Sequence, residues 1–112
     1  MTSNERQYVA IVMEVTTGRH GPYLIAYCQE YESVTFSLKN TEKDEWPETG
    51  DIILVSRLFK KPAGWRARKI RSFSPKDEEN PVLKAELTKL MDAREARIAA
   101  KKASYRKIKH SN

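Results

Sequence analysis

The chain has very few of the residues that build redox, metal or acid–base sites. Its 112 residues include one cysteine and two histidines. Cys28 has no second cysteine with which to form an internal disulfide, and one thiol cannot make a cysteine-rich zinc site. The histidines, His20 and His110, lie far apart along the chain. These shortages favour a reducing, cytoplasmic setting, and they predict no bound metal and no cofactor.

Motifs for catalysis are also missing. The sequence contains no serine–histidine–aspartate arrangement, no paired carboxylates between apolar residues and no glycine-rich phosphate loop. Glu14 lies in an expected strand, and alternation of polar and apolar residues places it on the outer side. We therefore expect a protein that is not an enzyme and has no catalytic residues.

Long hydrophobic runs are absent as well. A run such as residues 52–55 is far shorter than the roughly 20 apolar residues that a membrane-spanning helix needs. The first residues lack the basic-then-apolar order of a signal peptide. We expect no membrane contact, and the length suits one domain with a modest core.

Acidic residues are missing from residues 57–71, which hold seven lysines and arginines. The net charge of +6 is segregated, because residues 1–56 carry four basic and nine acidic groups. Residues 92–112 carry seven basic and two acidic groups. Two basic blocks on an otherwise acidic chain predict a polyanionic partner. Phe59 and Trp65 lie inside the first block, and aromatic faces stack on nucleic-acid bases.

Five segments have the alternation and composition of short strands. The third and fourth are separated by residues 40–51, a polar stretch with room for one helical turn, in which Trp46 is expected to cover the core. In the fifth segment Ala67 and Ile70 differ in parity, which predicts a bulge or a strong bend. The five segments are residues 7–16, 23–31, 33–39, 52–59 and 65–73.

Alternation also predicts which side chains share a face of each strand. The expected sets are Val9, Ile11, Met13 and Val15 in the first strand; Leu24, Ala26 and Cys28, opposite Tyr23, Ile25 and Tyr27, in the second; and Val34, Phe36 and Leu38, pointing inward, in the third.

The composition changes after residue 73. Residues 74–80 form a linker, in which Asn80 suits a helix N-cap, and Pro81 suits the first helical position. Residues 81–112 are expected to form a basic C-terminal helix. Its first turns are expected to dock on the barrel or on a partner, and residues beyond 91 to protrude or fray. The apolar stripe of the first turns consists of Leu83, Leu87, Leu90 and Met91.

Five short strands with a polar segment after the third are typical of an oligonucleotide-binding (OB) barrel. Residues 48–57, Glu-Thr-Gly-Asp-Ile-Ile-Leu-Val-Ser-Arg, add a family resemblance. They resemble the Gly-Asp-x-hydrophobic-x-hydrophobic entry to the fourth strand in cold-shock proteins and in bacterial translation initiation factor one. That factor has a basic turn and a basic fifth strand after this entry as well. The similarity covers residues 8–73, and the expected fold is mainly β, a five-stranded OB-type barrel over residues 7–73 followed by the helix.

The resemblance implies a binding face on the second and third strands, flanked by the first-to-second and fourth-to-fifth loops. The expected partner is RNA, or else single-stranded DNA. The basic C-terminal tail could add contacts in the manner of ribosomal-protein extensions, which makes the ribosome or translation the leading setting. Contacts would be mainly to phosphates, with some aromatic stacking. The expected nucleic-acid-binding residues are Arg19, His20, Tyr23, Tyr27, Arg57, Lys60, Lys61, Trp65, Arg66, Arg68 and Arg71, with Lys101, Lys102, Arg106 and Lys107 from the C-terminal helix.

A second hypothesis stays open, that of a protein-interaction module. OB barrels also bind proteins, and the leucine stripe could dock into a groove on a partner or pair with a second copy. The basic block would then be a solvated surface, and Trp65 would cover one end of the barrel. Salt separates the two hypotheses, because binding to phosphates weakens steeply with salt.

Overall fold

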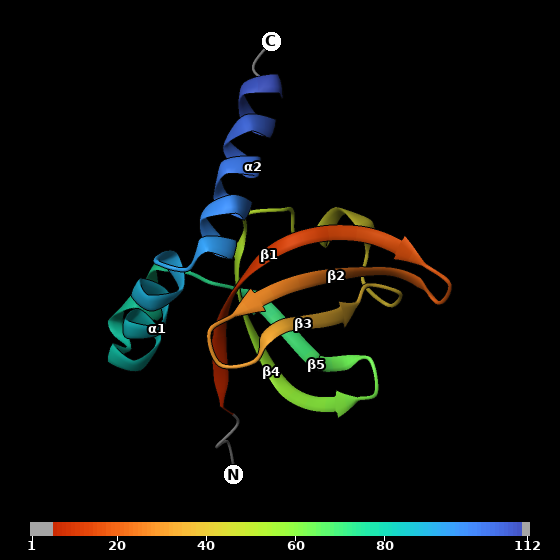
Figure 1. Ribbon diagram of the computed structural model, residues 1–112, viewed down its shortest axis with the longest axis horizontal. Coiled ribbons are helices and arrows are strands. Elements are labelled where there is room, and N and C mark those ends of the chain that lie inside the picture. Colours follow the sequence, from red (N-terminus) through yellow and green to blue (C-terminus); the bar gives the residue numbers. More distant parts are fainter. Residues whose placement is uncertain (1–5, 111–112) are drawn as a thin grey trace.

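Five strands close into a barrel, and two helices follow it (Figure 1). The computed structural model describes residues 6–110, with side chains for residues 6–103. The strands are β1 (Gln7–Gly18), β2 (Gly21–Cys28), β3 (Glu32–Ser37), β4 (Ile52–Lys61) and β5 (Gly64–Ser72). The short 3-10 helices are η1 (Lys43–Glu45) and η2 (Pro75–Glu79), and the α-helices are α1 (Pro81–Met91) and α2 (Arg94–His110).

The barrel has the strand order β1-β2-β3-β5-β4, and β4 returns to pair with β1. The β3–β5 pair is parallel, whereas the other pairs are antiparallel. The prediction of a mainly β, five-stranded OB-type barrel is confirmed. Closure leaves no long unpaired edge, which lets a short chain enclose a core.

A β-bulge in β1 lets this strand serve two hydrophobic clusters. The register with β2 shifts between Val12 and Glu14. Before the shift, alternate residues such as Val12 point into the barrel, and after it Val15 does. Val9 and Ile11 point outward to the helices. The predicted common face of four apolar residues is therefore wrong, because the extra residue of the bulge separates Val15 from the other three.

The inward faces of β2 and β3 agree with the alternation of polar and apolar residues in the sequence. Leu24, Ala26 and Cys28 of β2 are buried in the barrel, and burial raises the pKa of the Cys28 thiol. Phe36 of β3 packs against the same core. Trp46 follows the single turn of η1 and covers the core, with its Nε1 donating to a backbone carbonyl at 2.9 Å.

The bend expected in the fifth strand is shared with its neighbour β4, because Ala67 and Ile70 both pack on the core and the strand pairing passes over Arg57 and Arg68. β4 and β5 keep one register from Ile53↔Ser72 to Lys61↔Gly64, without a bulge. Arg57 of β4 instead has a φ of 55°, in the left-handed region that non-glycine residues seldom adopt. This bend in β4 lets both Ala67 and Ile70 of β5 pack on the core despite their different parity.

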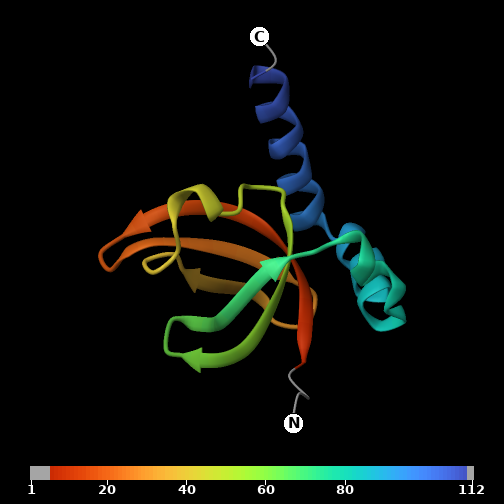
Figure 2. The same ribbon diagram turned by 180° about the vertical axis from the view of Figure 1, so that it is seen from behind.

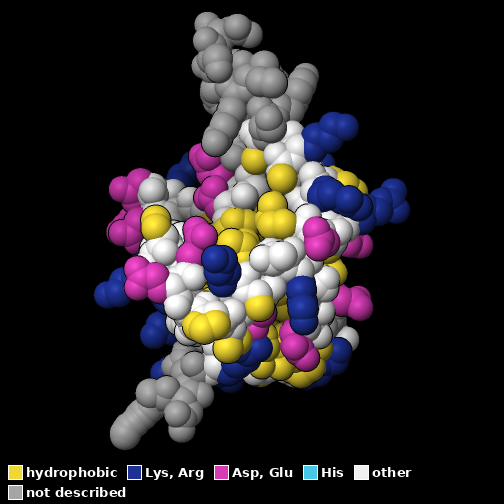
Figure 3. Space-filling view, turned by 90° about the vertical axis from the view of Figure 1, so that its left-hand side faces the viewer, with side chains coloured by type: hydrophobic (Ala, Val, Ile, Leu, Met, Phe, Trp, Pro, Cys, Tyr) yellow, Lys and Arg dark blue, Asp and Glu magenta, His cyan; other side chains and the backbone are white. Residues whose placement is uncertain are grey.

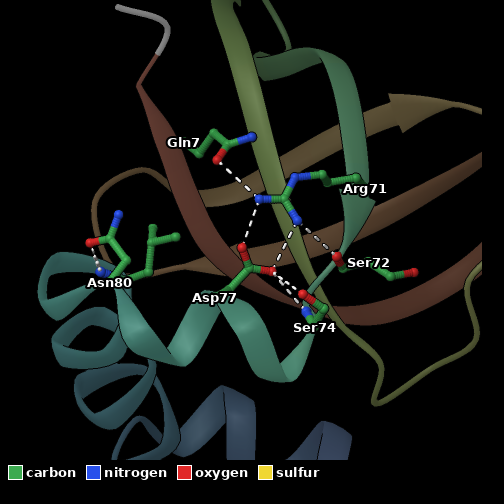
Figure 4. Close-up of polar contacts among 7 residues, drawn as sticks. Gln7, Arg71, Ser72, Ser74, Asp77 and Asn80 are labelled. Atoms are coloured by element: carbon green, nitrogen blue, oxygen red, sulfur yellow. Dashed lines mark hydrogen bonds and ion pairs between the residues drawn. The ribbon is translucent and has the colours of Figure 1, made fainter.

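The linker is ordered by one aspartate and one arginine (Figure 4). Arg71 of β5 donates two hydrogen bonds to the Asp77 carboxylate, at 2.8 and 2.9 Å. Asp77 also accepts from the backbone N–H of Ser74, which closes a capping box at the start of η2. The guanidinium of Arg71 and the Ser74 N–H hold the pKa of Asp77 well below its usual range. Asn80 then caps α1, as predicted, by accepting from the next two free N–H groups.

Helix α1 docks on the protein's own barrel. Leu90 is fully buried and Leu83 nearly so, against the outer side of β1. Leu87 is partly buried in the same cluster, whereas Met91 is 38% exposed. The Glu86 carboxylate accepts the N–H of Val9 at 3.0 Å, where β1 extends beyond its pairing with β2. Most of the leucine stripe is therefore used within the chain.

The C-terminal segment consists of two helices, with a break at residues 92–93. The expectation that it protrudes or frays from residue 92 is wrong for its first turns, because Ala96 and Ala99 of α2 are fully buried. Gly50 allows this close approach, since a Cβ added there would lie 2.2 Å from the Cβ of Ala103. Farther along, α2 extends away from the barrel (Figures 1 and 2). Over the described residues, neither helix has the length and apolar character that a membrane crossing requires.

Candidate nucleic-acid interface

A cleft of about 510 Å³ lies over the outer face of β2 and β3, between the tips of two β-hairpins. The β1–β2 hairpin closes with a two-residue turn, Arg19 and His20, between the paired Gly18 and Gly21. Gly21 has a φ of 108°, a conformation that glycine adopts without strain. The turn therefore presents an exposed arginine and an exposed histidine at the rim of the cleft.

The second tip closes the β4–β5 hairpin. Lys61 pairs with Gly64, so that Pro62 and Ala63 form the turn. Ala63 and Gly64 line the cleft, together with Trp65 and Arg66 of β5. The two tips come from opposite halves of the sequence, and barrel closure brings them to one cleft.

The floor of the cleft is a row of hydroxyl groups. Ser33, Thr35 and Ser37 occupy alternate positions of β3 and line the cleft. Ser37 pairs with Tyr23 of β2, and the ring of Tyr23 packs over Gly18, where an added Cβ would lie 3.0 Å from it. A hydroxyl donates and accepts hydrogen bonds, so this row can bind polar groups of either kind.

Trp65 belongs both to the cleft and to one end of the barrel. Its ring lies 4.7 Å from that of Tyr31, which contacts Tyr8 edge-on at 5.1 Å. The hydrogen bond from Tyr31 to the Tyr8 hydroxyl, together with burial, raises the pKa of Tyr31 to about 12. Lys60 Nζ lies 5.3 Å from the Trp65 ring centroid. The tryptophan is thus held firmly in place, with a cation beside it.

Charge at the cleft is mostly positive. Arg19 and Arg66 line it from opposite sides, and Glu32 is the acidic residue of its lining. Arg66 stands next to Thr35, its partner in the parallel pair of β3 and β5. An arginine beside hydroxyl groups offers a planar set of N–H donors suited to phosphate.

Two of the predicted nucleic-acid-binding residues, Tyr27 and Arg71, contact other parts of the protein instead of the cleft. Tyr27 packs against the cluster under the helices, where burial and the nearby Glu95 raise the pKa of its hydroxyl. Arg71 binds Asp77 and donates to Gln7 at 3.3 Å. Neither Tyr27 nor Arg71 lines the cleft.

Other predicted residues also lie apart from the cleft. Arg57 occupies the bend of β4, and Lys101 and Lys102 are exposed on α2. The side chains of Arg106 and Lys107 lie outside the part of the chain that the structure describes. The cleft therefore unites Arg19, His20, Tyr23, Trp65 and Arg66, with Lys60 against the tryptophan.

The hydroxyl row is the feature that sequence analysis did not select. Its signal was the alternation of Ser33, Thr35 and Ser37 with inward-pointing apolar residues, which marks the outer face of the strand. Sequence could not show that this face is the floor of a cleft, because the walls come from Arg19 and Arg66, far away in the chain.

The face that carries α1 differs in character (Figure 3). Acidic and basic side chains alternate over it, with apolar side chains exposed between them. The exposed apolar residues include Val82 at 52% and Met91 at 38%. The basic segment without acidic residues, residues 57–71, lies instead on β4, β5 and the turn between them.

The closed barrel and the cleft between its hairpin tips define a class of protein, an OB-type barrel with a groove over its second and third strands. Comparison with protein-family models, with curated proteins and with solved structures found no match. A fold by itself does not specify a ligand, so the chemistry of the cleft is what indicates a function.

Proposed function

We propose that the protein binds single-stranded RNA in the cleft over β2 and β3 and performs no catalysis. The observation that carries this proposal is the convergence of Arg19 and Arg66 across a hydroxyl floor, with Tyr23 and Trp65 at its sides. The arginines neutralise phosphates, and the aromatic rings stack on bases. A single strand exposes both, whereas a duplex buries its base faces.

The floor favours RNA over DNA. The ribose 2′-hydroxyl both donates and accepts hydrogen bonds, and it is the group that distinguishes RNA at a given site. Ser33, Thr35 and Ser37 present matching groups along one line of the cleft. The resemblance of residues 8–73 to cold-shock proteins and initiation factor one supports the same ligand, and translation or the ribosome as its setting.

The protein-interaction alternative loses its main argument. Leu83 and Leu90 of the stripe are buried against β1 of the same chain. Leu87 lies between them in the same cluster, so it stabilises the fold. A charged residue at position 87 would weaken the docking of α1, and its effect on any partner would follow from unfolding.

The test is a salt titration of binding to fluorescent single-stranded RNA. For the double variant Arg19→Gln/Arg66→Gln, we expect weaker binding, and a slope of log K against log salt that is less steep by about 1.4, or about 0.7 per lost phosphate contact. The control Lys84→Gln/Lys89→Gln removes the same charge from the exposed side of α1 and should leave the slope unchanged.

The same titration with DNA of identical sequence tests the choice of RNA. The native protein should bind RNA more tightly, and Thr35→Val should reduce that preference. If native protein binds neither strand at low salt, the proposal is wrong. Equal slopes for the cleft variant and the α1 control would place the phosphate contacts outside the cleft.

A further inference from the structure

The outer surface of the barrel continues past the cleft onto the β4–β5 hairpin. Directly paired residues of neighbouring strands point to the same side of a sheet. Thr35 on β3 pairs with Arg66 on β5, and Arg66 pairs with Phe59 on β4. Arg66 therefore joins the cleft floor to the surface of the hairpin. Two strand spacings separate Thr35 from Phe59, a distance of about 10 Å.

Phe59 on this surface is accompanied by cations. The Cζ of Arg68 lies 4.3 Å from the centroid of the Phe59 ring, and Nζ of Lys61 lies 5.9 Å from it. The cation–π contact with the ring fixes the position of the planar guanidinium, and its N–H groups stay available to a phosphate. Arg68 is exposed, and residues 57–71 contain no Asp or Glu.

We propose that Phe59, Lys61, Arg66 and Arg68 form an exit track, which binds the phosphates of an RNA strand that has left the cleft. This inference rests on the proposed function, since the strand reaches the track from the cleft through Arg66. Arg68, held by Phe59, is the central contact, and Lys61 adds a second charge at the hairpin tip. The track lengthens the site beyond the floor of the cleft.

Oligonucleotides of two lengths test the exit track. A uridine dinucleotide, whose stacked rise is about 3.4 Å per nucleotide, is too short to extend from the cleft floor to the hairpin. An oligouridine of about 12 nucleotides is long enough to reach the hairpin and lies within the range of OB-barrel sites. We expect Arg68→Gln to weaken binding of the longer strand roughly fivefold and to lower its salt slope by about 0.7. Binding of the shorter strand should not change.

Two further variants separate charge from stacking. Arg68→Lys keeps the charge and loses the flat guanidinium, so it should recover the slope while part of the affinity stays lost. Phe59→Ala should resemble Arg68→Lys, and thermal melting checks that its fold is intact. Lys84→Gln on α1 is the control for loss of one positive charge.

The outcomes distinguish the two proposals. If the native protein binds neither length, the proposed RNA function fails. If the native protein binds both lengths and Arg68→Gln binds both equally well, the exit track is wrong while the cleft stands. An equal loss for both lengths also contradicts the track, because Arg68 would then act within the cleft itself.

Discussion

Arginines of one basic block have different roles because of what each one touches. Arg71 is held in a two-bond fork by Asp77, which fixes the linker to β5. Arg66 stands at the cleft, and Arg68 lies over a phenylalanine ring. Sequence gives all three the same expected role, because the acid that binds Arg71 follows after the basic block ends. Only the turn at Ser74 brings that acid back to the strand.

The fork makes stability depend on pH in a defined direction. The pKa of Asp77 is lower in the folded protein than in the unfolded chain, where it is about 3.9. The carboxylate therefore contributes its full share of the folding stability above that unfolded pKa, and this share is lost as the pH falls below it. Asp77→Asn should lower the melting temperature at neutral pH, and the difference from the native protein should shrink below about pH 4.

Thermal melts between neutral pH and pH 2 check this expectation. Glu78→Gln is the matched control, since it neutralises an exposed acid of the same 3-10 helix. A melting difference for Asp77→Asn that stays constant through the acid range would show that its ion pair with Arg71 does not stabilise the fold.

The elements fit together at points where a small residue or a bulge makes room. Gly50 lies under α2, with Ala99 and Ala103 of the helix above it. The bulge after Val12 turns β1 so that one strand lines the barrel and also supports both helices. Such points are hard to predict from sequence. A glycine under a helix looks like any loop glycine, and the extra residue of a bulge looks like any other strand residue.

Gly50→Ala should separate α2 from the barrel. An added Cβ would overlap Ala103 in a conformation with φ of 94°, so we expect a loss of stability of about 1–3 kcal/mol from overpacking, in addition to backbone strain. Gly21→Ala is the matched control, because its φ of 108° imposes similar strain with no atom within 4 Å.

Urea unfolding of the two variants measures the difference. If Gly50→Ala and Gly21→Ala lose equal stability, the contact between Gly50 and α2 contributes nothing, and strain alone explains both.

The docking of α1 can be tested in the same way. Leu90 is fully buried, so Leu90→Ala should cost about 2–5 kcal/mol of unfolding free energy. Met91, its neighbour, is 38% exposed, and Met91→Ala should cost much less. Similar losses for both would mean that α1 does not rest on the barrel through Leu90.

At the scale of the whole molecule, the sequence predicted the barrel well and the site in part. Alternation located all five strands, because each buries one face against a shared core. It could not place Tyr27, since the outer face of β2 runs from the cleft to the helices and both ends look alike in sequence. Nor did it predict the break at residues 92–93, where helix-forming residues continue and tertiary packing sets the boundary.

The position of α2 predicts which truncations the molecule tolerates. A chain ending at Asp92 loses the buried Ala96 and Ala99, uncovers part of the apolar outer side of β1 and should melt at a lower temperature. A chain ending at Ala103 keeps these contacts and should melt close to the native protein. Equal melting of both would show that α2 does not stabilise the barrel.

Docking of the helices on β1 also sets an order of assembly. Strand β1 closes the barrel with β4 and is then covered by α1 and α2, which follow all five strands in the chain. Val9 and Ile11 therefore stay uncovered until both helices have been synthesised, and such transiently exposed apolar surface favours misassembly. The structure implies that the nascent chain is most vulnerable between closure of the barrel and arrival of its C-terminal helix.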